Sequence, residues 1–253
     1  MIVASSTRIQ NIPCLILREM RFGCGPLLLH YHAWAEDKGN LLSPDITLVQ
    51  AASEGFTVIC PDCPEHGGRK TAAQFRKTMN GWAFICAVIE QAKQESGKLL
   101  ESLFDLPFVS SRHGVISGVS MGALIAQMIF AQEQRLGALV SVVGRSSLLQ
   151  YDPWCRQAQL GNWTHKWGQK QAMQAHPKRF IGRSILFLDG AKDTLCPPVI
   201  NAKTVKLINR VGGQAIQIID RNAGHCFSLS MRHQFINWIR MQCGINERFR
   251  AMR

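Results

Sequence analysis

The sequence predicts an α/β fold with a mostly parallel sheet and helices on both of its faces. Short runs rich in aliphatic and β-branched residues recur along the 253-residue chain, and a longer segment with apolar residues at helical spacing follows most of them. This alternation is typical of parallel strands joined by crossover helices. Since 46% of the residues are hydrophobic, the chain can form one large core, which favours a single domain over residues 1–253.

The elements are expected in a regular order. Residues 1–25 predict an antiparallel hairpin at one edge of the sheet. Later strands are short apolar runs such as Phe56–Cys60 (FTVIC), and helices are longer runs in which apolar residues recur every three or four positions. The strands are predicted over residues 26–31, 56–60, 114–119, 136–143, 184–188 and 215–219. The helices are predicted over residues 43–53, 70–94, 121–133, 198–210 and 229–243.

One connection is too long for an ordinary loop. Residues 144–182 separate the fourth and fifth of these strands, and connections of that length usually carry structure or function of their own. The segment holds Trp154, Trp163 and Trp167, half of the six tryptophans. It is therefore predicted to be a cap inserted after the fourth long strand, with its tryptophans forming a local core or a pocket wall.

The formal net charge of +12 lies in the second half of the chain. Residues 1–127 hold 11 basic and 11 acidic residues, whereas residues 128–253 hold 18 and 6. From Arg145 to Arg183, seven basic residues stand against one acid, Asp152, a net charge of +6. Because the basic residues are scattered singly and form no zinc-finger or polybasic motif, no nucleic-acid partner is expected.

Cysteine usage and hydropathy predict a cytoplasmic protein. The nine cysteines form no clustered framework, which favours a reducing compartment. Neither a signal peptide nor an apolar stretch near the roughly 20 residues of a membrane span is evident, so no membrane partner is expected. Cys60 and Cys63 are interpreted as small apolar residues at a strand end. With His66 they would lack a fourth metal ligand, and His66 with Asp62 is expected to brace its loop instead.

The motif that points most directly to chemistry is Gly118-Val119-Ser120-Met121-Gly122, a G-x-S-x-G between a predicted strand and a predicted helix. A nucleophilic serine on such a tight turn projects its oxygen above the sheet, and the flanking glycines leave room for the turn. The amide of Met121, at the start of the helix, can donate to developing negative charge.

A serine nucleophile needs a histidine base and a carboxylate that orients it. In this strand order both should follow on later loops, the acid first. Asp193 lies on a turn closed by Pro197 after the fifth strand, and His225 follows Gly224 after the sixth. Asp189, which would end the fifth strand, is interpreted as structural, and Asp220 is a rival acid. The pair His30 and His32 near the first long strand is not expected to bind a metal, since no further ligand is evident.

Residues 24–243 resemble the α/β-hydrolases, in particular the small bacterial serine esterases of the dienelactone-hydrolase and prolyl-oligopeptidase-like branch, of the YjfP type. The resemblance rests on Tyr31–Trp34 in place of Y-H-G-F, on residues 61–69 as P-D-x-P-x-H-G-x-R, and on residues 118–122 as G-x-S-M-G. The motif G-x-x-D-x-x-x-P over residues 190–197 and a late histidine loop at His225 complete it.

The resemblance implies that Ser120, Asp193 and His225 form a catalytic triad, with the amides of Trp34 and Met121 as the oxyanion hole. It implies hydrolysis of a carboxylic ester through an acyl-enzyme, without a metal or organic cofactor. A thioesterase or peptidase would use the same triad. Ala33 replaces the family's glycine, and a positive φ there would strain it and favour a catalytically silent binding protein. If the basic cap faces the site, small anionic esters are the expected substrates.

Overall fold

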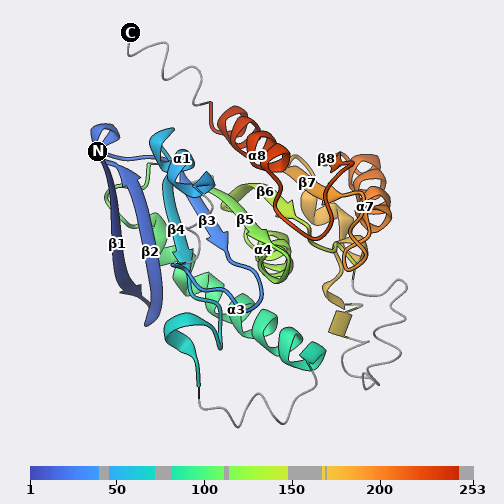
Figure 1. Ribbon diagram of the computed structural model, residues 1–253, viewed down its shortest axis with the longest axis horizontal. Helices are drawn as coiled ribbons and strands as arrows, with labels where there is room; N and C mark the ends of the chain where they lie inside the picture. Colours follow the sequence, from blue (N-terminus) through green and yellow to red (C-terminus); the bar gives the residue numbers. More distant parts are fainter. Residues whose placement is uncertain (40–45, 72–80, 111–113, 148–166, 169, 245–253) are drawn as a thin grey trace.

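Eight strands form one sheet in the computed structural model (Figure 1). The structure describes residues 1–39, 46–71, 81–110, 114–147, 167–168 and 170–244. The strand order is β1-β2-β4-β3-β5-β6-β7-β8. The pairs β1–β2 and β2–β4 are antiparallel, and every other neighbouring pair is parallel. The predicted fold class and the edge hairpin are therefore confirmed.

The strands and helices have the following bounds. The strands are β1 (Ile2–Ile9), β2 (Ile12–Glu19), β3 (Leu27–Tyr31), β4 (Thr57–Pro61), β5 (Gly114–Val119), β6 (Leu136–Val142), β7 (Ser184–Gly190) and β8 (Gln214–Asp220). The α-helices are α1 (Thr47–Ser53), α3 (Gly81–Phe104), α4 (Met121–Gln132), α7 (Pro198–Arg210) and α8 (Leu229–Gln242). Short 3-10 helices are η1 (Met20–Phe22), η3 (Gly67–Arg69), η4 (Met173–Ala175) and η5 (Pro177–Phe180).

The helix predicted over residues 70–94 differs most from the observed one. Lys70 is extended after η3, and residues 72–80 lie outside the described residues. At the other end α3 continues to Phe104, since Leu99, Leu100 and Leu103 carry its buried face further, and Pro107 follows the helix. No helix in the described segments, α3 included, is long and apolar enough to cross a membrane.

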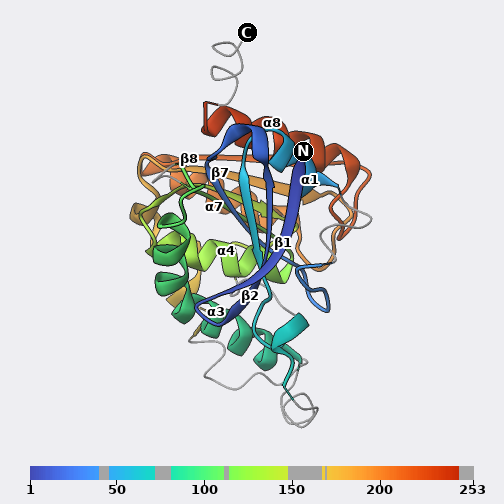
Figure 2. The same ribbon diagram turned by 90° about the vertical axis from the view of Figure 1, so that its left-hand side faces the viewer.

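Helices cover both faces of the sheet (Figure 2). Successive strand residues point to opposite faces, so Leu28 belongs to one buried cluster and Leu29 to the other. The cluster around Leu29 packs on α3, α4 and α7, whereas the cluster around Leu28 packs on α1 and α8. Burial on both faces explains why the parallel strands are nearly continuous apolar runs rather than alternating ones.

The described end of the predicted cap packs on the main core. Trp167 is buried and its indole N–H donates to Glu90 Oε2 of α3 at 2.8 Å. Phe180 is fully buried and stacks on Phe130 of α4, with ring centroids 6.0 Å apart. These residues therefore belong to the α3–α4 face of the domain. Residues 148–166 and 169, with Trp154 and Trp163, lie outside the described residues, so the cap over 144–182 stays a prediction.

Arg183 is also part of this core. Its guanidinium lies 3.5 Å from the centroid of the Phe130 ring and donates to the carbonyl oxygens of Glu133 and Leu136. Burial lowers its pKa to about 10, so the side chain stays charged at neutral pH. Arg183 directly precedes β7 and therefore lies at the amino edge of the parallel sheet. Lys178 and Arg179 of η5, a few residues earlier in the chain, lie at the same edge.

The turn from β5 to α4 crosses the end of β3 at very short range. A Cβ at Gly122 would lie 2.1 Å from Tyr31 O and 2.5 Å from His32 O. A Cβ at Gly118 would lie 2.2 Å from Gly122 O. Both positions therefore require glycine because the backbones themselves fill the space.

We expect Gly122→Ala to lower the free energy of unfolding by about 1–3 kcal/mol or more, because the added methyl group must push two backbone carbonyls apart. Gly97→Ala is the matched control, since nothing lies within 4 Å of a Cβ at that position in α3. It should raise stability by about 0.5–1 kcal/mol. Thermal unfolding measures both, and equal effects of the two substitutions would contradict the close crossing.

Candidate active site

Ser120 occupies a strained turn between β5 and α4. Its φ of 54° and ψ of −112° place it outside the regions that L-residues favour. The backbone is held on both sides, because the N–H of Ser120 donates to Val142 O at 2.9 Å and its carbonyl accepts from Ala123 at 3.0 Å. The turn places the serine hydroxyl beyond the carboxyl end of β5.

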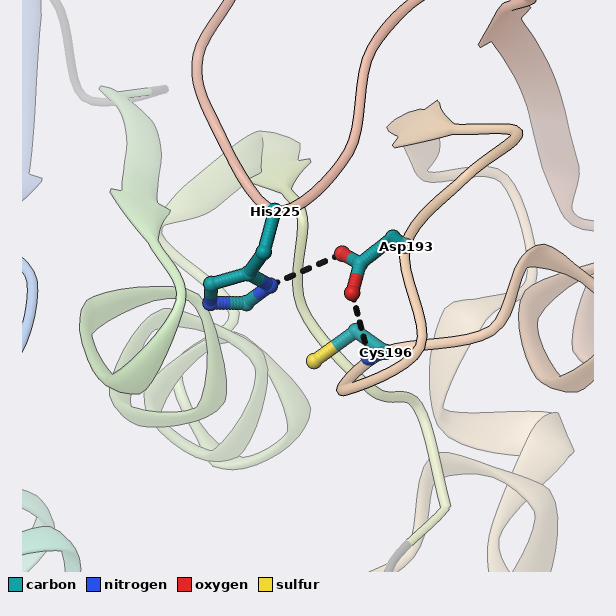
Figure 3. A group of neighbouring side chains, drawn as sticks. All are labelled: Asp193, Cys196 and His225. Carbon is teal, nitrogen blue, oxygen red and sulfur yellow. Dashed lines mark hydrogen bonds and ion pairs between the residues drawn. The ribbon is translucent and has the colours of Figure 1, made fainter.

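A chain of two hydrogen bonds joins this serine to a histidine and an aspartate. Ser120 Oγ lies 2.8 Å from His225 Nε2. His225 Nδ1 lies 2.8 Å from Asp193 Oδ2, and Figure 3 shows this second link. With Nδ1 facing a carboxylate, the neutral ring carries its proton on Nδ1 and Nε2 accepts from the hydroxyl. The histidine side chain is 25% exposed and can reach a bound substrate.

Asp193 is held by the backbone of its own turn. We call Asp193–Pro197 the acid turn. Oδ1 of Asp193 accepts from the N–H groups of Leu195 at 2.9 Å and Cys196 at 2.8 Å, and the side chain is fully buried. Burial acts to raise the pKa of this carboxyl, but the hydrogen bonds from His225 and the two amides outweigh it, and the pKa is lowered. Asp193 is therefore an anion at neutral pH.

Two other acids hold other parts of the fold: Asp189, which the sequence indicates is structural, and the rival acid Asp220. Asp189, at the end of β7, is fully buried and accepts from Asn201 Nδ2 at 2.9 Å and Gln217 Nε2 at 2.6 Å. Asp220 accepts from the Asn222 N–H and from Ser228 Oγ, beside the start of α8. Asp193 is the acid that faces the histidine.

The two expected oxyanion donors lie on segments that meet at Gly122. Met121 begins α4, where the first N–H groups have no acceptor within the helix. Trp34 follows β3, whose end touches the start of α4 through the close approach of Tyr31 and Gly122. The Met121 amide is thus next to Ser120 in the chain, and the loop that carries Trp34 begins beside the start of α4.

The loop that carries Trp34 is braced on both sides. The N–H of Ala33 donates to Glu36 Oε2 at 2.9 Å, and the His32 Nδ1 donates to Ala33 O at 2.8 Å. His32 Nε2 in turn accepts from the N–H of Cys63 at 3.0 Å. Burial lowers the pKa of His32 to about 4, so this ring is neutral. The role of Glu36 was not predicted from the sequence. The signal for it was its position three residues after Ala33, which lets its side chain reach back to the Ala33 N–H.

The strain expected at Ala33 is absent. Among the described residues other than glycine, Ala35 has a positive φ of 64°, but Ala33 does not. The hypothesis that alanine in place of the family's glycine distorts the loop is therefore wrong. The positive φ falls two residues later, at Ala35, and the φ of Ala33 is not positive.

Residues near this loop have the structural roles that the sequence indicated. His66 Nδ1 bonds to Pro64 O, and Asp62 accepts from Lys38 Nζ and the Gly68 N–H, both at 2.8 Å. Cys60 and Cys63 are fully buried, and burial raises the pKa of both thiols. His30 Nδ1 bonds to Ser117 Oγ at 2.8 Å. The loop-bracing role of His66 and Asp62 is confirmed.

A thiol beside the histidine was not singled out from the sequence. Cys196 lies on the acid turn, and its sulfur lies near the side chains of Asp193 and His225 (Figure 3). The signal available in the sequence was the spacing of three residues between Asp193 and Cys196 on a turn closed by Pro197. A turn this short brings its fourth residue back toward its first.

The sheet, the strained serine turn and the Ser–His–Asp arrangement define the α/β-hydrolase class. A family model described as the prolyl oligopeptidase family matches residues 48–243. The chain belongs to this family of serine hydrolases, which confirms the resemblance expected from the sequence.

One curated relative is esterase YjfP of Escherichia coli (strain K12). It is 26% identical over 119 residues, which make up 47% of this chain and 45% of that protein. The match thus spans slightly less than half of either protein.

Solved structures share the fold at low sequence identity. TT1662 from Thermus thermophilus has a TM-score of 0.80 at 18% identity and covers 95% of this chain and 98% of its own. A putative dienelactone hydrolase from Klebsiella pneumoniae has a TM-score of 0.69 at 15% identity, covering 97% and 99%. An acylaminoacyl peptidase from Pyrococcus horikoshii has a TM-score of 0.74 at 12% identity, covering 98% of this chain but 42% of its own.

The buried acid at Asp189 yields a test that separates it from Asp193. Burial raises the pKa of Asp189 to about 6, despite the hydrogen bonds from Gln217 and Asn201, whereas an unfolded aspartate titrates near 3.9. Between these values the folded state holds a proton that the unfolded state has lost. The stability of the wild type relative to Asp189→Asn should therefore fall by about 2 kcal/mol as the pH rises from about 4 to 6, and then level off.

Asp220→Asn is the control of opposite sign. The pKa of Asp220 is lowered by its hydrogen bonds to Ser228 and Asn222, so its contribution is present above the unfolded pKa and is lost as the pH falls. Denaturant unfolding over a pH series measures both differences. A pH-independent difference for Asp189→Asn would show that folding does not shift the pKa of this carboxyl, and would contradict the prediction.

Proposed function

We propose that this protein is a serine hydrolase that cleaves a carboxylic ester through an acyl-enzyme. The observation that carries the proposal is the hydrogen-bonded chain from Ser120 through His225 to Asp193, with both links at 2.8 Å. A serine hydroxyl is a weak nucleophile by itself, and a base within hydrogen-bond reach is what activates it.

In the acylation step Ser120 Oγ attacks the ester carbonyl while His225 Nε2 accepts the hydroxyl proton. The imidazolium that forms is stabilised by the adjacent Asp193 carboxylate, whose lowered pKa keeps it ionised. The carbonyl oxygen becomes an oxyanion, and we assign its two donors to the backbone N–H groups of Trp34 and Met121. His225 then gives its proton to the leaving alcohol.

In the deacylation step His225 acts as a base again. It takes a proton from a water molecule that attacks the acyl-enzyme, and it returns that proton to Ser120 when the acid leaves. Every step uses groups of this chain, and the aspartate holds one ring orientation throughout, because its other oxygen is fixed by two backbone amides.

The choice of an ester rests on the partial match to esterase YjfP. The same chemistry would cleave a thioester or an amide, and one structural neighbour is named a peptidase. A panel of one acyl group as its aryl ester, its thioester and its aminoacyl amide separates the three. The highest kcat/KM is expected for the ester.

The rival hypothesis of a catalytically silent binding protein loses its main support. Its first motive is strain at Ala33, and the φ of that residue is not positive. Its second motive is the basic cap, and three of the seven basic residues from Arg145 to Arg183 lie away from the site. Arg183 is a core residue, and Lys178 and Arg179 lie at the amino edge of the sheet, opposite the site.

We propose that any preference for anionic esters comes from two basic residues near the site, Arg145 and Lys192, rather than from the whole basic segment. Arg145 and Lys192 follow the carboxyl ends of β6 and β7, which is the edge that bears Asp193. Arg156, Lys166 and the other charges of residues 148–166 lie outside the described residues. Lys178 and Arg179 are separated from the site by the length of β7, roughly 20 Å, well beyond the Debye length of about 8 Å at physiological salt.

The nucleophile is tested with an organophosphonate probe and a short-chain aryl ester. Ser120→Ala should lose covalent labelling and lower kcat/KM by at least about 10,000-fold, because the attacking oxygen is gone. Ser184→Ala, at the amino end of β7, is the matched control and should retain both. Labelling that persists in Ser120→Ala would overturn the assignment.

The charge proposal is tested by ionic strength. We expect kcat/KM for an anionic half-ester to fall at least about 3-fold between 0.01 and 0.15 M salt, because the Debye length falls from about 30 to 8 Å. The kcat/KM for a neutral ester should change little. Lys192→Gln should reduce this salt dependence, and Lys178→Gln should leave it intact. Equal salt dependence for the two esters would refute electrostatic steering.

A further inference from the structure

The acid turn and the histidine loop bring together a third reactive group. One ligand atom each from Asp193, Cys196 and His225 can be chosen so that all three lie within 4.8 Å of one another. Within the described segments of the chain, this is the single group of three or more histidine, cysteine or acidic side chains so arranged. The proposed mechanism assigns roles to His225 and Asp193 but none to the Cys196 thiol.

The position of the thiol is set by the backbone. The N–H of Cys196 donates to Asp193 Oδ1 at 2.8 Å, which ties the start of the acid turn to its fourth residue. The Cys196 side chain extends from this turn to the side on which the His225 ring lies (Figure 3). Asp193 is fully buried and His225 is partly exposed, so the cluster is anchored at one end and reachable from solvent at the other.

This donor set matches a borderline divalent cation. Thiolate sulfur, imidazole nitrogen and carboxylate oxygen are the ligands of Zn²⁺, at about 2.3, 2.0–2.1 and 2.0–2.2 Å. Tetrahedral geometry at those lengths separates ligand atoms by roughly 3.3–3.7 Å. Atoms that now lie within 4.8 Å reach that arrangement by side-chain shifts of about an ångström. A thiolate and a carboxylate would balance the charge of the ion, and water would take the fourth position.

We infer that Asp193, Cys196 and His225 form an inhibitory site for Zn²⁺ or a similar soft divalent cation. On binding, the Cys196 thiol releases its proton to water, and the metal takes a lone pair from sulfur, from a carboxylate oxygen and from one ring nitrogen. If the metal binds Nε2, that atom is blocked. If it binds Nδ1, the ring proton moves to Nε2. In either case Nε2 cannot accept the proton of Ser120.

The inhibitory role rests on the proposed function, but metal binding by itself does not. The first experiment therefore uses the Ser120→Ala protein and Cd²⁺, whose bond to a thiolate gives an ultraviolet charge-transfer band. We expect the band to saturate at one Cd²⁺ per chain and to be lost in Cys196→Ser and Cys196→Ala. Cys226→Ser removes the exposed thiol next to His225 in sequence and is the matched control, which should keep the band.

The second experiment measures Zn²⁺ inhibition of ester hydrolysis, with each variant compared with its own metal-free rate. Cys196→Ser should raise the half-inhibitory Zn²⁺ concentration by about 10-fold or more, because even outer partners of a metal contribute about 10–100-fold in affinity. Cys226→Ser should match the wild type, and a chelator should restore activity.

The two experiments fail separately. A cadmium band that survives both Cys196 variants, or that disappears in Cys226→Ser, would overturn the site whatever the activity of the enzyme. Equal Zn²⁺ sensitivity of the wild type and Cys196→Ser would overturn the inhibitory role. Cadmium binding through Cys196 in a protein without esterase activity would uphold the site and overturn the proposed function.

Discussion

The common direction of strands β3 to β8 is the constraint on which the site depends. Because these strands are parallel, their carboxyl ends meet at one edge of the sheet, and the turns that follow β5, β7 and β8 carry Ser120, Asp193 and His225. Residues 105 positions apart thereby come within hydrogen-bond distance. Helices bury both faces of strands β3 to β7, so none of these strands can slip without moving its apolar side chains out of a packed layer.

Backbone groups complete the site. Two amides of the acid turn hold Asp193 and keep its pKa low, so burial does not neutralise the carboxylate. Carbonyl and amide contacts around Ala33 fix the loop after β3, and the close approach at Gly122 presses that loop against the start of α4. The shortness of the acid turn also places the Cys196 thiol beside the histidine. A turn short enough to orient the acid leaves its fourth residue next to the acid's partner.

Charge and aromatic residues are distributed by packing rather than by proximity in sequence. The sequence predicts that most of the segment from Trp167 to Arg183 belongs to a basic cap, because this segment directly follows the rest of the predicted cap in the chain. In the fold, Trp167 and Phe180 fill the α3–α4 face and Arg183 lies over Phe130 at the sheet's amino edge. Of the described basic residues of the run from Arg145 to Arg183, Lys178, Arg179 and Arg183 lie at the amino edge of the sheet, about 20 Å from the catalytic edge, whereas Arg145 follows the carboxyl end of β6.

The sequence by itself determined the fold class, the order of the strands along the chain, and Ser120, Asp193 and His225 as the residues to bring together. Local spacing suffices for these features, because apolar periodicity and the glycines of a tight turn are read within a few residues. Tertiary structure alone decided the full extent of α3, the sign of φ at Ala33, the bracing by Glu36, the core position of Arg183 and the place of Cys196 beside the histidine. Each of these depends on what another segment places against the residue, and such contacts between distant segments leave no local pattern in the sequence.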